Sequence, residues 1–211
     1  MSTTLVGVLC GVGAAHLVAY YAGQRAIAGT LKALPILALA ATVLGTAGPA
    51  DASYGRMIAL GLVLSTIGDV SLVFESGFLV GLSAFFIAHL CYIVAFAGGA
   101  TPTPTAAAAA VALAVVAVGM LRYLWPHVAR LRVPVTAYVV ALSIMAWCAI
   151  ARATASGAGP AEVAAAIGAT SFLVSDSVLA VNRFARPFPG AHAVVMVTYY
   201  AAQMLIARSA L

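Results

Sequence analysis

Eight long apolar segments follow one another along the chain, separated by short polar breaks. A helix that crosses the hydrocarbon core of a bilayer needs about 20 mostly apolar residues. The segments that reach or approach this length are residues 4–21, 31–47, 56–74, 78–97, 106–124, 133–151, 161–181 and 191–208. Backbone polar groups inside a membrane must bond within their own segment, so such segments form helices. We therefore expect an all-α integral membrane protein with eight transmembrane helices.

The composition predicts that lipid, rather than water, surrounds most of the 211 residues. Hydrophobic residues make up 64% of the chain and charged residues only 7%, whereas soluble domains carry about 25% charged residues. No hydrophilic stretch is long enough for a second domain, so we expect one transmembrane domain over residues 1–211. The first segment lacks the basic start of a signal peptide and is expected to be a retained helix. Basic residues stand singly, without interleaved aromatic residues, so no nucleic-acid partner is expected.

The distribution of Lys and Arg predicts the orientation, because cytoplasmic loops of membrane proteins carry an excess of them. One side, formed by the connections after the first, fifth and seventh segments, has seven such residues: Arg25, Lys32, Arg122, Arg130, Arg132, Arg183 and Arg186. The opposite side has three: Arg56, Arg152 and Arg208. We therefore expect both termini on the non-cytoplasmic face of a bacterial-type inner or plasma membrane.

A weak internal repeat relates the two halves of the chain. A shift of 107 residues places Gly68-Asp69-x-x-Leu72 on Ser175-Asp176-x-x-Leu179. The same shift aligns two stripes with helical spacing, one of Phe85, His89, Tyr92 and Phe96 and one of His192, Met196, Tyr199 and Gln203. The match is confined to the last two helices of each half. It favours two parallel four-helix repeats, an arrangement found in some transporters.

Two acidic residues, Asp69 and Asp176, lie well inside apolar segments. A carboxylate in hydrocarbon costs a few kcal/mol or more, so its presence indicates a function. Each lies five residues before the end of its segment, and we expect both at similar depth toward the cytoplasmic side. Two neighbouring carboxyl groups tend to share one proton, which provides a general acid and a general base. The structural alternative is that each bonds a neighbouring helix or pairs with Lys32 or Arg183.

Other polar residues fall in the same apolar segments. His89 lies in mid-helix, with Tyr92 one turn further, and the pair either orients an aspartate or a water molecule or packs as ordinary polar residues. Tyr199, Tyr200 and Gln203 either line the same cavity or form interhelical hydrogen bonds. No metal-ligand spacing, serine-nucleophile elbow or dinucleotide-binding loop occurs. We therefore expect neither a metal nor a cofactor.

Five stretches, in order from the second segment to the C-terminus, carry a recognisable set of motifs: residues 31–35, 61–72, 78–92, 172–184 and 199–206. The most informative parts are Lys32 with Pro35, Ser65-x-x-Gly68-Asp69 and Phe172-x-x-Ser175-Asp176. Together the stretches resemble the YhhN family of membrane proteins, whose animal members are lysoplasmalogenases. The fifth and sixth segments carry little of this resemblance.

The resemblance implies an eight-helix enzyme that hydrolyses the vinyl-ether bond of lysoplasmalogens (lysoplasmenylethanolamine or lysoplasmenylcholine). The products would be a fatty aldehyde and glycerophosphoethanolamine or glycerophosphocholine. Asp69 and Asp176 would be the catalytic pair, with Ser65 and Ser175 beside them in the motifs. Residues near the cytoplasmic helix ends would hold the lipid phosphate by charge and hydrogen bonding: Lys32, Asn182 and Arg183.

Three functions stay open at this point. The leading hypothesis is a hydrolase that acts on a single-chain ether lysophospholipid in the bilayer. The second is a proton-coupled transporter of an amphiphilic molecule, with Asp69, Asp176 and His89 as a proton relay. The third, a non-catalytic scaffold, is disfavoured by the buried acids. Nothing in the sequence identifies a protein partner.

Overall fold

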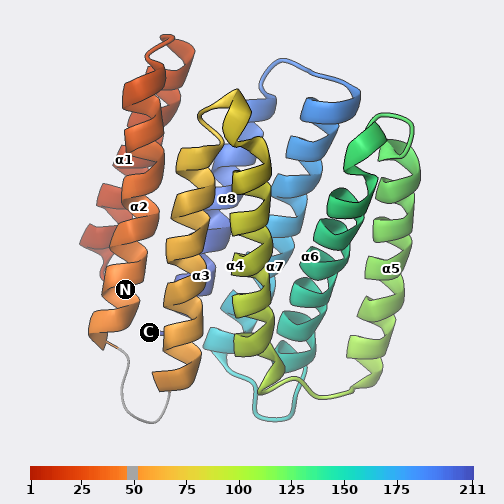
Figure 1. Cartoon of the computed structure of the whole chain (residues 1–211). Helices are drawn as coiled ribbons and strands as arrows, with labels where there is room; N and C mark the ends of the chain where they lie inside the picture. Colours follow the sequence, from red (N-terminus) through yellow and green to blue (C-terminus); the bar gives the residue numbers. More distant parts are fainter. Residues whose placement is uncertain (47–51) are drawn as a thin grey trace. The chain divides into compact units, whose positions relative to one another are not determined.

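The computed structural model describes residues 1–46 and 52–211, and within them the chain forms eight α-helices (Figure 1). They are α1 (Thr3–Tyr21), α2 (Arg25–Thr46), α3 (Ala52–Ser71), α4 (Phe78–Ala97), α5 (Pro104–Leu124), α6 (Arg132–Ala153), α7 (Pro160–Ala180) and α8 (Ala191–Arg208). This part of the chain has no β-strand. The predicted all-α class is therefore confirmed. The largest differences from the expected bounds are in α2, which begins at Arg25 rather than at residue 31, and in α3. α3 begins at Ala52 rather than at residue 56 and ends at Ser71 rather than at residue 74.

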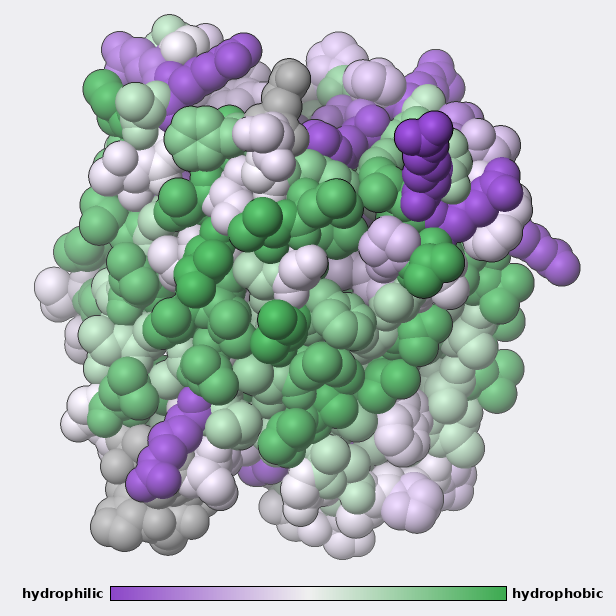
Figure 2. Space-filling model, in the orientation of Figure 1, coloured by the Kyte–Doolittle hydropathy of each residue, from purple (hydrophilic) through white to green (hydrophobic). Residues whose placement is uncertain are grey.

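Six helical segments in the described residues are long and apolar enough to cross a membrane. They are α1, α2, α4, α5, α6 with the 3₁₀ turn before it (Ala129–Ala153) and α7 with the π-helical turn after it (Pro160–Ala185). The chain is thus a multi-pass membrane protein. α3 and α8 fall outside this group, and both carry polar side chains such as Asp69 and Gln203. On the face shown in Figure 2, hydrophobic residues cover the middle of the helices and hydrophilic ones gather toward their ends.

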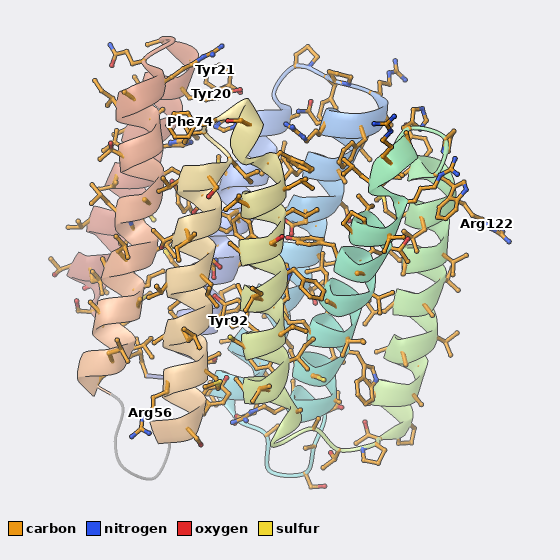
Figure 3. All side chains as sticks on the ribbon, in the orientation of Figure 1. Tyr20, Tyr21, Arg56, Phe74, Tyr92 and Arg122 are labelled. Carbon is orange, nitrogen blue, oxygen red and sulfur yellow. The ribbon has the colours of Figure 1, made fainter. Side chains whose placement is uncertain are left out.

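The described chain divides into two compact units, residues 1–95 with 210–211 and residues 96–209. In the first unit, α2 packs against both α1 and α3. α3 approaches α4 through glycines that leave room for large side chains. The ring of Tyr92, labelled in Figure 3, lies where a Cβ on Gly61 would be, and Phe85 lies 2.5 Å from the Cβ position of Gly68. The two contacts share one antiparallel register, in which Ser65 is level with Ala88.

The turn between α3 and α4 is tight because of Gly77, which precedes α4. A Cβ at this position would overlap the carbonyl oxygen of Ser71, the last residue of α3. The absence of a side chain lets the chain fold back directly against the end of α3. This close return explains why α3 ends three residues earlier than the apolar segment does.

In the second unit, α6 packs against α5 and α7, and α7 forms a long antiparallel pair with α8. Gly168 allows this close approach, because the carbonyl oxygen of Ala202 lies 2.9 Å from the position of a Cβ there. The rings of Phe172 and Tyr199 meet edge to face at 5.5 Å. Such aromatic pairs stabilise by roughly 0.5–1.5 kcal/mol beyond their burial. The contact of Phe172 with Tyr199 positions the half of α7 that carries Ser175 and Asp176.

Candidate functional site

Asp69 forms an ion pair with Lys32 in the first unit. The Lys32 Nζ atom lies 2.9 Å from Asp69 Oδ1, and the side chains are 16% and 1% exposed. Lys32 lies two turns inside α2 rather than in a loop, because that helix begins at Arg25. A buried carboxylate is tolerated when a counter-charge accompanies it. The structure thus contains the pairing of Asp69 with Lys32 that the sequence left open as an alternative.

His16 of α1 joins this charged pair, although its position near a helix end gave no reason to single it out. Its side chain is buried, and Nδ1 donates a hydrogen bond to the carbonyl of Ala28 at 2.8 Å. Ala28 lies one turn before Lys32 on α2, and His16 interacts electrostatically with both Lys32 and Asp69. Three ionisable groups from α1, α2 and α3 therefore gather inside the first unit. The only sequence signal for His16 was a histidine in an apolar segment.

Ser65, His89 and Tyr92 are fully buried. Ser65 lies one turn before Asp69 on α3, so both side chains project from the same side of the helix. The Ser65 hydroxyl has no hydrogen-bond partner among the described residues. His89 shares a face of α4 with Phe85 and Tyr92, the two rings that fit against the glycines of α3. The structure thus brings these predicted residues together along the α3–α4 contact.

In the second unit, Asp176 accepts a hydrogen bond from a phenol. The hydroxyl of Tyr138 on α6 donates to Asp176 Oδ2 at 2.5 Å, and both side chains are half-buried. Sequence reasoning did not find Tyr138, because α6 contains none of the motifs. A single tyrosine in an otherwise apolar helix was the only available signal. Asp176 therefore has a neutral donor, whereas Asp69 has a cation.

The remaining candidate residues on α7 and α8 form their hydrogen bonds within this pair of helices. Ser175 donates to the carbonyl of Val195 at 3.0 Å and so connects α7 to α8. Gln203 Nε2 donates to the Tyr199 hydroxyl at 3.2 Å within α8, and both residues are buried. Tyr200 is half-buried, with its ring 5.7 Å from that of Tyr199. Neighbouring residues Ser175 and Asp176 consequently face different helices, α8 and α6.

A π-helical turn, Val181–Ala185, follows α7 and carries Asn182 and Arg183. Asn182 Oδ1 accepts a hydrogen bond from the backbone N–H of Phe188 at 3.2 Å, which fixes the return toward α8. The Arg183 side chain is exposed. Turns of this kind occur often at functional sites. Of the basic residues predicted to hold a phosphate, Arg183 is exposed while Lys32 meets a carboxylate.

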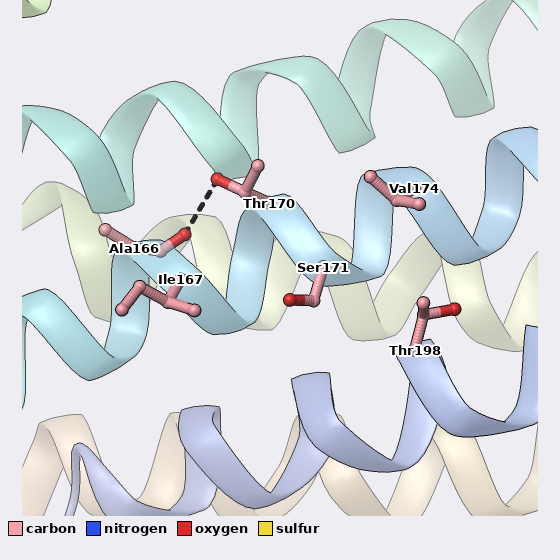
Figure 4. Close-up of a pocket in the computed structure, with 6 residues that line it drawn as sticks. All are labelled: Ala166, Ile167, Thr170, Ser171, Val174 and Thr198. Atoms are coloured by element: carbon pink, nitrogen blue, oxygen red, sulfur yellow. Dashed lines mark hydrogen bonds between the residues drawn. The ribbon is translucent and has the colours of Figure 1, made fainter.

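A shallow pocket of about 370 Å³ lies between α7 and α8 (Figure 4). Its hydroxyl groups include Thr170 and Thr198, which donate to carbonyls one turn earlier in their own helices, Ala166 and Val194. The pocket contains neither motif aspartate. With those hydroxyls occupied by the backbone, its surface suits an alkyl segment better than a polar headgroup.

The two aspartates are not equally far from their helix ends. Asp69 is two residues from the end of α3, whereas Asp176 is four residues from the end of α7 and the π-helical turn extends that helix. The equal spacing expected from the apolar segments was wrong because the chain turns back at Gly77. Asp69 and Asp176 belong to different units. Their equal depth and their approach to one another stay predictions.

The family model of the YhhN family matches residues 28–210, a range that includes every predicted site residue. The chain belongs to the YhhN family. Lysoplasmalogenase TMEM86B of Sus scrofa is 39% identical over 184 residues, which cover 87% of this chain and 75% of the relative. The protein of that name in Homo sapiens is 37% identical over the same shares of both chains. Lysoplasmalogenase of Mycobacterium tuberculosis is 36% identical over 159 residues, 72% of this chain and 59% of the relative.

The resemblance to the YhhN family is therefore confirmed. No solved structure matches the chain. In the present structure, one of the two YhhN motif aspartates is paired with a lysine and the other accepts a hydrogen bond from a tyrosine.

Proposed function

We propose that this YhhN-family protein is a lysoplasmalogenase, which hydrolyses the vinyl-ether bond of a single-chain ether lysophospholipid within the bilayer. The observation that carries this proposal is its identity of 32–39% to proteins named lysoplasmalogenase over most of its length. The two carboxyl groups held inside apolar helices support it, since they supply acid–base chemistry without a cofactor.

The reaction begins with transfer of a proton to the outer carbon of the enol ether, which leaves an oxocarbenium ion. A carboxylate then removes a proton from water as the water adds to this cation. The resulting hemiacetal collapses to a fatty aldehyde and the glycerol hydroxyl of glycerophosphoethanolamine or glycerophosphocholine. One protonated and one ionised carboxyl group provide both steps, and a nearby carboxylate stabilises the cation.

We assign the base to Asp69 and the acid to Asp176. The ion pair with Lys32 supports a carboxylate at Asp69, since an ammonium favours a negatively charged partner. Tyr138 orients Asp176 through one oxygen. The exposed Arg183 holds the phosphate, with Asn182 keeping the adjoining turn in place. Ser65, His89 and Tyr92 form the wall of the first unit along which the ether is positioned.

The architecture proposed for this function has eight spanning helices and non-cytoplasmic termini, in a bacterial-type plasma membrane. α3 and α8, with 20 and 18 residues, are close in length to the six apolar spans and differ from them in being less apolar. The boundary between units at residues 95 and 96 supports two parallel four-helix repeats. Reporter fusions after Leu211 and near Arg130 should give opposite readouts. Matching readouts would contradict this topology.

Isotope incorporation tests the reaction. Purified protein is incubated with lysoplasmenylethanolamine in heavy water. The aldehyde is trapped early, because a free aldehyde slowly exchanges the hydrogens on the carbon next to its carbonyl group with the solvent. We expect one deuterium on the carbon next to the aldehyde and a slower rate than in ordinary water. The Asp176→Asn variant is the control for background hydrolysis. Intact lipid after prolonged incubation with folded protein would reject the proposal and favour a proton-coupled transporter, which leaves the ether bond unbroken.

A further inference from the structure

A long apolar groove runs between α5 and α6 in the second unit, and neither motif aspartate lines it. Its first part has a volume of about 380 Å³ and is lined by small and aliphatic side chains, including Ala110, Ala114 and Ala117 of α5 and Val140 and Ile144 of α6. Trp147 closes one end and donates from Nε1 to the carbonyl of Ala106 at 3.0 Å. The alanines leave space that larger residues on α5 would fill.

The groove continues into a second hollow that ends among polar residues. This part, also about 380 Å³, shares Val118 and Leu121 with the first and is lined further by Arg122 and Trp125. From Ala110 to Arg122 the groove follows twelve residues of α5, or about 18 Å along the helix. That length is close to half of the roughly 30 Å hydrocarbon core, which is the depth that one lipid chain occupies.

Arginine and tryptophan are held together where the groove ends. The Arg132 guanidinium lies 4.8 Å from the centre of the Trp125 ring, and its Nε donates to the Trp125 carbonyl at 3.4 Å. The Arg122 side chain is exposed and extends away from α5 (Figure 3). The sequence has no acidic residue between Glu75 and Glu162, and Glu162 bonds Arg152. Arg122 and Arg132 therefore have no acidic residue in the part of the sequence that forms α5 and α6.

We propose that this α5–α6 groove binds an anionic phospholipid, with its phosphate at Arg122 and Arg132 and one acyl chain along the alanines toward Trp147. Three features specify this occupant: an apolar channel of about one chain length, two guanidinium groups at one end, and a tryptophan at the level where membrane headgroups meet hydrocarbon. The site is separate from the proposed hydrolysis and does not depend on it. A lipid without net negative charge would gain the chain contacts but not the attraction at the arginines.

Tryptophan fluorescence reports on this groove directly, because the only two tryptophans of the chain, Trp125 and Trp147, line its two ends. The full-length protein is reconstituted in vesicles that contain brominated phosphatidylglycerol or brominated phosphatidylcholine at equal mole fractions. We expect the anionic lipid to quench with about thirtyfold higher apparent affinity, because each of two basic residues near a membrane surface contributes about fivefold. Equal quenching by both lipids would overturn the proposal and indicate ordinary solvation.

Paired variants locate the site. Arg122→Gln should lower the preference for the anionic lipid about fivefold, whereas Arg208→Gln, which deletes another exposed charge, on α8, should leave it unchanged. Ala114→Phe should fill the channel and weaken quenching of Trp147 by both lipids. Val115→Phe, on an exposed face of α5 outside the groove, is its matched control. An equal effect within either pair would overturn the assignment to this groove.

Discussion

The two motif aspartates occupy similar sequence settings but different chemical surroundings. Asp69 is almost fully buried and faces the ammonium of Lys32, with His16 interacting with both. Asp176 is half-buried and accepts a hydrogen bond from the neutral hydroxyl of Tyr138. The serines near the two acids also differ in their hydrogen bonding. Ser175 bonds a backbone carbonyl, whereas the Ser65 hydroxyl has no partner among the described residues.

This difference shows how a repeated motif supplies two unlike groups. An ammonium fixes a compensating negative charge on its partner, because separating the charges inside apolar surroundings is costly. A phenol can donate to a carboxylate or to the carbonyl oxygen of a carboxylic acid, so it orients the group in either charge state. Asp69 is thus suited to rest as a carboxylate that can accept a proton, and Asp176 to rest as a protonated group that can donate one. The following substitutions test this contrast.

The largest effects are expected when either acid is replaced. Asp69→Asn and Asp176→Asn should each lower the rate of aldehyde release about a thousandfold, equivalent to several kcal/mol of transition-state stabilisation. The double variant should be little slower than either single variant, because the two residues act as a unit. Near wild-type turnover by either folded single variant would contradict a shared role.

Replacement of the Lys32 cation should destabilise the first unit. Lys32→Met leaves the buried Asp69 carboxylate uncompensated and should lower the free energy of unfolding by about 3 kcal/mol. Adding Asp69→Asn should recover most of this loss. Unfolding in detergent measures both, with Arg25→Met as a control that deletes an exposed charge at the start of the same helix. If the double variant unfolds as easily as Lys32→Met, the ion pair is not the cause.

A smaller effect is expected in the second unit from Tyr138→Phe, which removes the hydrogen bond to Asp176 and keeps the ring. A typical hydrogen bond contributes about 0.5–1.5 kcal/mol, so the turnover rate should fall by up to about tenfold. Tyr123→Phe, which changes an exposed tyrosine of α5, is the matched control. Equal rates for the two variants would show that Tyr138 does not position the acid.

The smallest effects should distinguish the two serines. Ser175→Ala removes a buried hydrogen bond to α8 and should lower the free energy of unfolding by about 1 kcal/mol. Ser65→Ala removes a buried hydroxyl that has no hydrogen-bond partner in the described part of the chain, and it should leave stability unchanged or slightly increased. Denaturant unfolding of both variants in the same detergent measures the difference. A loss at Ser65 as large as that at Ser175 would show that Ser65 has a bound partner in solution.

Sequence patterns predicted the eight helices of the described residues and the position of the two acids inside two of them, because long apolar segments and charges within them are local features. The partners of those acids depend on how helices pack, which local patterns do not specify. Lys32 was assigned to an interface because the second apolar segment begins late, yet α2 already includes it. Tyr138 and His16 had no motif around them, and only the contact of α6 with α7 and of α1 with α2 gives them a role.

The fit of Tyr92 and Phe85 against Gly61 and Gly68 restricts how this protein can change over time. At Gly68, even one added methyl group would meet an aromatic ring. A larger residue there is therefore acceptable only when Phe85 becomes smaller as well. Substitutions along this contact should consequently arise as compensating pairs, so that related sequences would vary at both positions together or at neither.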